Sequence, residues 1–156
     1  MFVSVEVEAH YRHLEAVEGE LAELCGMANA IHGRMVELVG DALDNDLWAG
    51  HGIHSPEHWL GWKSSMTRAS VRAVVSLAKR RSDLPLTTTA LSEGTISLAQ
   101  AGLIARHVPA VFEESVMEFA TQATVSQLQR TLPRYGFDPD PDPDPKPGPD
   151  PEPEPG

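Results

Sequence analysis

A regular apolar repeat over residues 14–42 constrains the fold most strongly. Apolar residues recur there at alternating intervals of three and four positions, which is a heptad seam sustained over four repeats. The seam consists of Leu14, Val17, Leu21, Leu24, Ala28, Ile31, Met35, Leu38 and Ala42. This spacing predicts one continuous helix from about residue 8 to residue 43, which is long enough to reach across a domain of this size.

Four glycines recur every seven residues on the face of this helix opposite the seam. They are Gly19, Gly26, Gly33 and Gly40. Each should weaken the helix by roughly 0.5–1 kcal/mol relative to alanine. Either another backbone packs closely against this face, or the helix bends. We expect the seam itself to pack on the later helices of the same domain. Pairing of the seam with a partner helix or with a second copy is the alternative.

The remainder of the chain predicts shorter helices and no strand. Ser55 before Pro56 is typical of a helix start, and Thr67 caps a further helix after a break near Ser65. No segment alternates with the period of a strand, so residues 1–137 predict a single all-α domain, a long helix packed on a bundle. The later predicted helices span residues 86–93, 98–107, 110–122 and 124 to about 132, and capping boxes begin the second and the last of them.

A different composition begins at residue 138, where the sequence reads DPDPDPDPKPGPDPEPEPG. Proline lacks an amide hydrogen and fixes φ, and the repeated acids repel one another. Residues 138–156 therefore predict a disordered acidic spacer. A spacer normally joins two domains, so this one suggests a truncated product, a fragment or a lost partner domain.

The formal charge of −11 is unevenly distributed along the chain. Residues 1–58 hold eleven acids and two bases, whereas residues 59–107 hold seven bases and two acids, a net charge of +5. Since charges are screened over about 10 Å at moderate salt, a local basic face can act despite the negative total. Double-stranded DNA therefore stays a possible partner.

Three features predict a cytoplasmic protein without a membrane partner. Cys25 is the single cysteine and cannot form an internal disulfide, which fits a reducing compartment. No run of 18 apolar residues is present, so no membrane span is expected. The acidic N-terminus lacks the basic start and apolar run of a signal peptide.

Residues 57–76 fit the pattern of a helix-turn-helix unit. The pattern has 20 positions, counted here from Glu57, and it fits if the numbering of these positions is shifted by one at its start. Its apolar, small and turn positions are then occupied by Leu60, Gly61, Ser65, Met66, Val71 and Val74. We predict that Arg68 and Arg72 contact bases or phosphates. We predict that the phosphate backbone is held by Lys63, Lys79, Arg80 and Arg81. The competing interpretation is a pair of core helices with a solvated basic stripe.

Other candidate chemistry is weak. The histidines of GHGIHSPEHW have a spacing compatible with zinc, but two lie in a loop and no dependable fourth ligand follows, so we predict no metal. These histidines are His51, His54 and His58. No carboxylate pair, nucleophile triad or phosphate loop is apparent, so we predict no catalytic residue, no cofactor and no small-molecule substrate. We expect Trp48, Trp59 and Trp62 to be core anchors.

Three blocks resemble the actinobacterial domain of unknown function 222, also called the 13E12 repeat family. The blocks are HSPEHWLGWKSSMTRASVRAVVSLAKR, LPLTTTALSEGTISLAQAGLIARH and ATVSQLQRTLPRY, within the run from Trp48 to Tyr135. The resemblance implies a DNA-associated domain that usually precedes an HNH endonuclease module, often through an acidic spacer. The domain's own activity is not established. The sequence contains no His-Asn-His segment, so nuclease activity is carried over to no residue.

Residues 67–105 show a weaker similarity to the helix-turn-helix of ParB-type partition proteins. The shared order is a helix, Leu-Pro, a short helix, a glycine and a helix beginning at Ile-Ser. This resemblance favours placing Arg68 and Arg72 at the start of a recognition helix. The sequence therefore predicts an all-α DNA-binding or DNA-positioning domain, with a dimerisation or interaction module as the alternative.

Overall fold

The computed structural model describes residues 4–134, and this range is helical without a strand. The all-α prediction is therefore confirmed, whereas the spacer predicted over residues 138–156 lies outside the described residues. The elements are α1 (Val5–Asp44), α2 (Pro56–Ser64), α3 (Arg68–Lys79), α4 (Pro85–Glu93), α5 (Leu98–His107), η1 (Ala110–Phe112), α6 (Glu113–Ala120), α7 (Val125–Thr131) and η2 (Leu132–Arg134).

The predicted caps begin the shorter helices. The Ser55 side chain accepts the amide hydrogen of His58, 3.0 Å away, at the start of α2. Both predicted capping boxes, which begin α5 and α7, are formed. Because a cap satisfies amide groups that no helical carbonyl reaches, these local hydrogen bonds fix where each helix begins.

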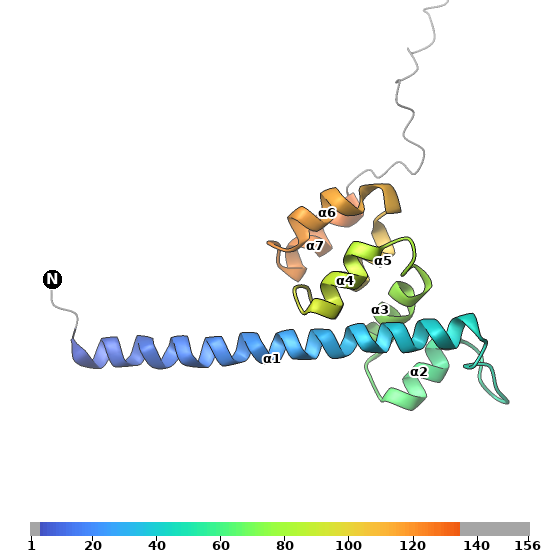
Figure 1. Ribbon diagram of the computed structural model, residues 1–156, viewed down its shortest axis with the longest axis horizontal. Coiled ribbons are helices and arrows are strands. Elements are labelled where there is room, and N and C mark those ends of the chain that lie inside the picture. Colours follow the sequence, from blue (N-terminus) through green and yellow to red (C-terminus); the bar gives the residue numbers. More distant parts are fainter. Residues whose placement is uncertain (1–3, 135–156) are drawn as a thin grey trace, which may run out of the picture.

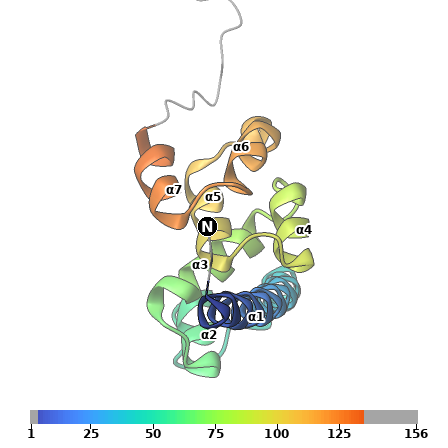
Figure 2. The same ribbon diagram turned by 90° about the vertical axis from the view of Figure 1, so that its left-hand side faces the viewer.

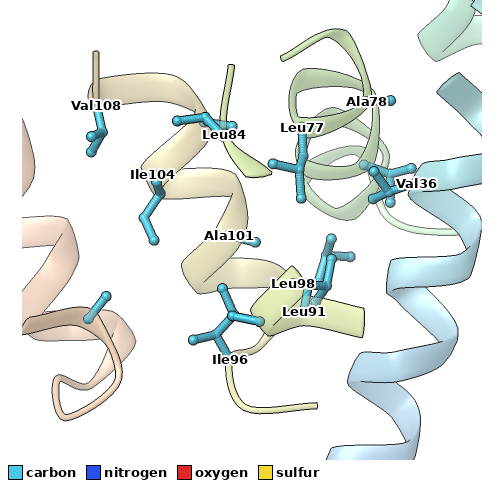
Figure 3. Close-up of a cluster of buried hydrophobic side chains, with 14 of the residues drawn as sticks. Val36, Leu77, Ala78, Leu84, Leu91, Ile96, Leu98, Ala101, Ile104 and Val108 are labelled. Atoms are coloured by element: carbon cyan, nitrogen blue, oxygen red, sulfur yellow. The ribbon is translucent and has the colours of Figure 1, made fainter. Parts of the chain in front are cut away.

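Helix α3 lies at the centre of the fold, packed against α1, α2 and α5. Its buried residues include Leu77 and Ala78, which lie beside Val36 of α1 in the core cluster of Figure 3. Ala101 and Ile104 of α5 belong to the same cluster. One side of α3 is thereby committed to the core, and the other is left for contacts outside it.

The later helices form the body of the domain. Helix α1 packs on this body through its glycine face, and only along its C-terminal half (Figure 1). A Cβ atom added at Gly33 would lie 2.7 Å from the Cα atom of Ser92 in α4. A Cβ atom added at Gly94 would lie 2.6 Å from the carbonyl oxygen of Gly26. Of the two interpretations of the glycine repeat, close backbone packing is the one that the structure supports.

The prediction that the seam packs on the later helices is wrong for most of its length. The exposed members retain 42–61% of their surface: Leu14, Val17, Leu21, Leu24, Ile31 and Leu38. Met35 is partly buried and Ala42 is buried. The reason is geometric, since the glycines admit the backbone of α4 on one face and the seam lies on the opposite face. In Figure 2, which looks along α1, helices α4, α5, α6 and α7 lie on one side of α1, whereas α2 lies on the other side.

Candidate nucleic-acid interface

Helices α2 and α3 are joined by a tight turn over Ser65–Thr67. Ser65 has a left-handed backbone with φ of 57°, and its amide closes α2 on the carbonyl of Gly61. Thr67 then caps α3 by accepting the amide hydrogen of Ser70 at 3.2 Å. Buried Leu60 and Val71 hold the two helices in the core. The turn therefore fixes how the start of α3 is presented.

Arg68 and Arg72 lie on the first two turns of α3, and both are exposed. Neither guanidinium pairs with a carboxylate among residues 4–134. The first turn of α3 also has no acidic residue, although a helix N-terminus favours negative charge. The start of α3 thus combines two guanidinium groups with the positive end of a helix dipole.

A hollow of about 570 Å³ lies between α1, α3, α5 and α7. Arg72 and Arg106 line it, together with polar side chains that include Asn29, His32 and Gln129. No carboxylate is among its lining residues. The buried Nδ1 atom of His32 has no hydrogen-bond partner within the described range. The charges that surround this hollow suit an anion.

A second hollow of about 680 Å³ lies between α2 and α3, lined by Trp62, Arg68 and Arg72 among others. Glu57 is the one carboxylate among its lining residues. Trp62 is 67% exposed, so its prediction as a core anchor is wrong. The ammonium of Lys63 lies 4.2 Å from the centre of the Trp62 ring, a cation–π contact. We call Lys63, Arg68, Arg72 and Arg106 the basic groove.

Arg80, also predicted to hold the DNA backbone, is bonded into the fold. Its Nη1 atom donates to the carbonyl oxygens of Ala105 and Val108, at 2.8 and 2.7 Å. These carbonyls belong to the end of α5, where helical amides no longer reach them. Arg80 therefore caps α5, and its contact with DNA stays a prediction that the fold does not require.

Arg81 and Lys79 also have partners within the domain. Arg81 donates to the carbonyl oxygen of Ala78 at 2.6 Å and pairs with the carboxylate of Asp44 at the end of α1. The Lys79 ammonium lies 3.5 Å from the Glu57 carboxylate. Exposed pairs of this kind are weak, so Lys79 stays available to phosphate more readily than Arg81.

The residue spacing does not identify Arg106 as a DNA-binding candidate, although Arg106 belongs to the basic middle of the chain. It joins Arg72 because α5 packs tightly on α3, where a Cβ atom added at Gly102 would lie 2.6 Å from the Cβ atom of Ala73. A glycine facing an alanine is the signal that could have indicated the packing of these two helices.

Burial, and then the neighbouring Arg106 charge, lower the pKa of His107, which favours its neutral form.

The histidine cluster serves the loop before α2. The rings of His54 and His58 stack with centroids 5.3 Å apart, and the backbone amide of His54 donates to Nδ1 of His58 at 3.2 Å. Among residues 4–134, no group of three or more metal-binding side chains is assembled. Nor does any described helix combine the length and apolar character that a membrane span needs.

Comparison with known proteins finds no match among curated proteins and none among solved structures. Residues 18–136, which include most of α1 and every later helix, match the family described as "Domain of unknown function (DUF222)". This match covers the groove and the glycine-packed half of α1. The chain therefore belongs to the family of domain of unknown function 222.

Proposed function

We propose that this domain binds double-stranded DNA through the basic groove. The observation that carries the proposal is the set of three arginines, Arg68, Arg72 and Arg106, that line adjoining hollows without a carboxylate partner in the described range. Arginine binds phosphate in a bidentate manner, and unpaired guanidinium groups lose no ion pair when phosphate arrives.

The groove suggests a division of roles. Arg72 and Arg106 share the hollow between α1, α3, α5 and α7, where no lining carboxylate competes, and hold backbone phosphate there. Arg68 begins α3 and is the side chain best placed to reach a base edge in the major groove. Lys63, over the Trp62 ring, adds a contact at the α2 end of the groove.

The acidic part of the chain limits how strong this binding is. Helix α1 contains nine acids and two bases, so the field far from the protein repels DNA. Affinity must therefore come from contacts within about 10 Å of the groove. We propose a domain that positions DNA for an HNH endonuclease-type protein and carries no catalysis itself. The HNH association rests on the family resemblance alone.

Fluorescence anisotropy with a labelled duplex tests the proposal. At about 50 mM salt we expect binding, and log K should fall linearly with log salt, by about 0.9 per phosphate contact. Combined Arg68→Ala and Arg72→Ala substitutions should weaken binding about tenfold or more and reduce that slope by about 2. Both side chains are exposed, so the fold should be unaffected.

The matched control combines Arg12→Ala with Arg134→Ala. Both of these arginines are exposed and neither lines the two hollows, so the control removes the same charge elsewhere. Equal weakening by the two variants would mean that only overall charge matters, which contradicts a groove. Absence of binding at low salt would overturn the proposal outright. Arg80→Ala is unsuitable here because it uncaps α5.

A further inference from the structure

The N-terminal half of α1 presents an apolar seam that the domain does not cover. Every residue from Ser4 to Cys25 is exposed, and α1 extends well beyond the body in Figure 1. At 1.5 Å per residue its 40 residues span about 60 Å. A helix in water draws most of its stability from packing of its apolar face, which this half lacks within the described range. The exposed seam therefore needs an occupant.

Charge identifies what kind of occupant fits. The seam lies on a helix with nine acids and two bases, which repels DNA phosphates and anionic lipid. A heptad seam is complementary to another heptad seam, because the apolar side chains of one helix fill the spaces between those of the other. The fitting occupant is thus an α-helix with the same repeat.

We propose that the occupant is the seam of a second copy of this chain, paired antiparallel. The exposed stretch runs from Leu14 to Leu38, so its midpoint is level with residue 26. A two-fold axis at that level places Leu14 opposite Leu38 of the second copy and Leu21 opposite its Ile31. Every exposed seam residue is then covered, and both copies use the same surface, as a two-fold interface requires.

The charges beside the seam favour this orientation and register. Glu20 falls opposite Arg34 of the second copy, and symmetry forms the pair twice. A parallel pair would place Glu20 opposite Cys25 and Arg34 opposite Val39, which the domain body already buries. An antiparallel pair shifted toward the N-terminus would bring Glu20 against its own counterpart. The proposed register alone among these three gives Arg34 an acidic partner across the interface.

Neither the fold nor the existing ion pairs oppose the interface. Helix α4 packs on the glycine face of α1, opposite the exposed part of the seam, so α4 to α7 of each copy lie on the outside of the helix pair, and α2 lies beside the C-terminal end of α1. Arg34 is 2.8 Å from Glu37 of its own helix, but both side chains are more than half exposed. A pair of that kind is weak and exchanges readily for a partner across the interface.

Sedimentation equilibrium of the full chain measures the pairing. We expect a dimer, with Leu21→Asp shifting it to monomer. Glu20→Arg alone and Arg34→Glu alone should each raise the dimer dissociation constant about tenfold, since each places like charges opposite one another. The double variant should restore dimerisation. Glu23→Arg, an equal change in charge on the polar side of the same turn, should have little effect.

Cys25 supplies an independent measurement without any substitution, since it is exposed and unpaired. In the proposed register the two Cys25 side chains lie near the axis on the same side of the helix pair, so a short bis-maleimide should trap the dimer. A parallel pair puts them on opposite sides.

A monomer at every concentration would overturn the proposal. So would a dimer that is insensitive to Leu21→Asp, or a charge exchange without rescue. The basic groove uses other residues, so DNA binding and pairing fail or succeed separately.

Discussion

The two halves of α1 share one sequence pattern and have opposite structural fates. Both carry the seam and a glycine every seven residues. The half from Gly26 onward lies against α3 and α4, whereas Ser4–Cys25 is exposed. The comparison shows that the repeat predicts a helix but not what the helix packs on. Which part of α1 is packed depends on the residues of α4, which come about sixty positions later in the sequence.

The glycines therefore have different roles in the two halves. At Gly33 the missing Cβ atom lets the backbone of Ser92 approach, so the glycine is a contact residue. At Gly19 nothing lies within 4 Å of the site where a Cβ atom would be. There the glycine only gives up helix propensity. Alanine substitutions along one face of one helix should therefore change stability with opposite signs.

The largest effect is expected from Gly33→Ala. The new methyl group would lie 2.7 Å from both the Cα and Oγ atoms of Ser92, and 2.9 Å from its amide nitrogen. The backbone of α4 cannot yield as a side chain would, so α1 and α4 must separate. We expect a loss of about 2 kcal/mol in the free energy of unfolding, after the gain in helix propensity. Urea denaturation of the variant beside the parent chain measures it.

A second close approach between α1 and the end of α4 provides the check on Gly33→Ala. Gly94→Ala should also destabilise, because its φ is +83° and its Cβ atom would lie 2.6 Å from the carbonyl oxygen of Gly26. If both variants unfold like the parent chain, α1 is not docked through its glycine face, and the contrast between its two halves disappears.

A smaller effect is expected from Gly40→Ala. Its Cβ atom would meet the Arg81 side chain, with Nε at 2.6 Å, and a side chain can move where a backbone cannot. Moving it breaks the contacts of Arg81 with Asp44 and with the carbonyl of Ala78. We expect a loss of about 1 kcal/mol in the free energy of unfolding.

A double-mutant cycle identifies the cause of that loss. In an Arg81→Ala background the obstacle is gone, so Gly40→Ala should become neutral or stabilising. An unchanged cost in that background would place the obstacle elsewhere, against the contact that the structure shows.

Local signals account for the parts of the fold that were predicted. The starts of α2, α3, α5 and α7 follow from side chains that bond amides three residues ahead, which any reader of the sequence can find. The all-α class follows in the same way from spacing within each segment. Such signals do not depend on where the rest of the chain lies.

Contacts between distant segments account for the failures. Helix α4 has no side-chain cap of its own, and its first amides donate to Glu113, at 3.1 Å from Leu86 and 3.0 Å from Thr87. Nothing in the sequence beside Glu113 marks it as a buried carboxylate. Likewise Arg72 and Arg80 lie on or beside one helix, and only the position of α5 makes one a groove residue and the other a cap.

The smallest effect, and the one of opposite sign, is expected from Gly19→Ala. The substitution removes a helix-weakening residue from a face with nothing within 4 Å, so it should stabilise the N-terminal half of α1 by about 0.5–1 kcal/mol. Because this half does not pack on the body, the gain should appear as slower amide exchange around residue 19 more than as a higher unfolding midpoint. Gly19 lies opposite the seam, so pairing of two copies would not reverse the sign. A loss of protection would mean that another segment covers this face, and the two halves of α1 would then be packed alike.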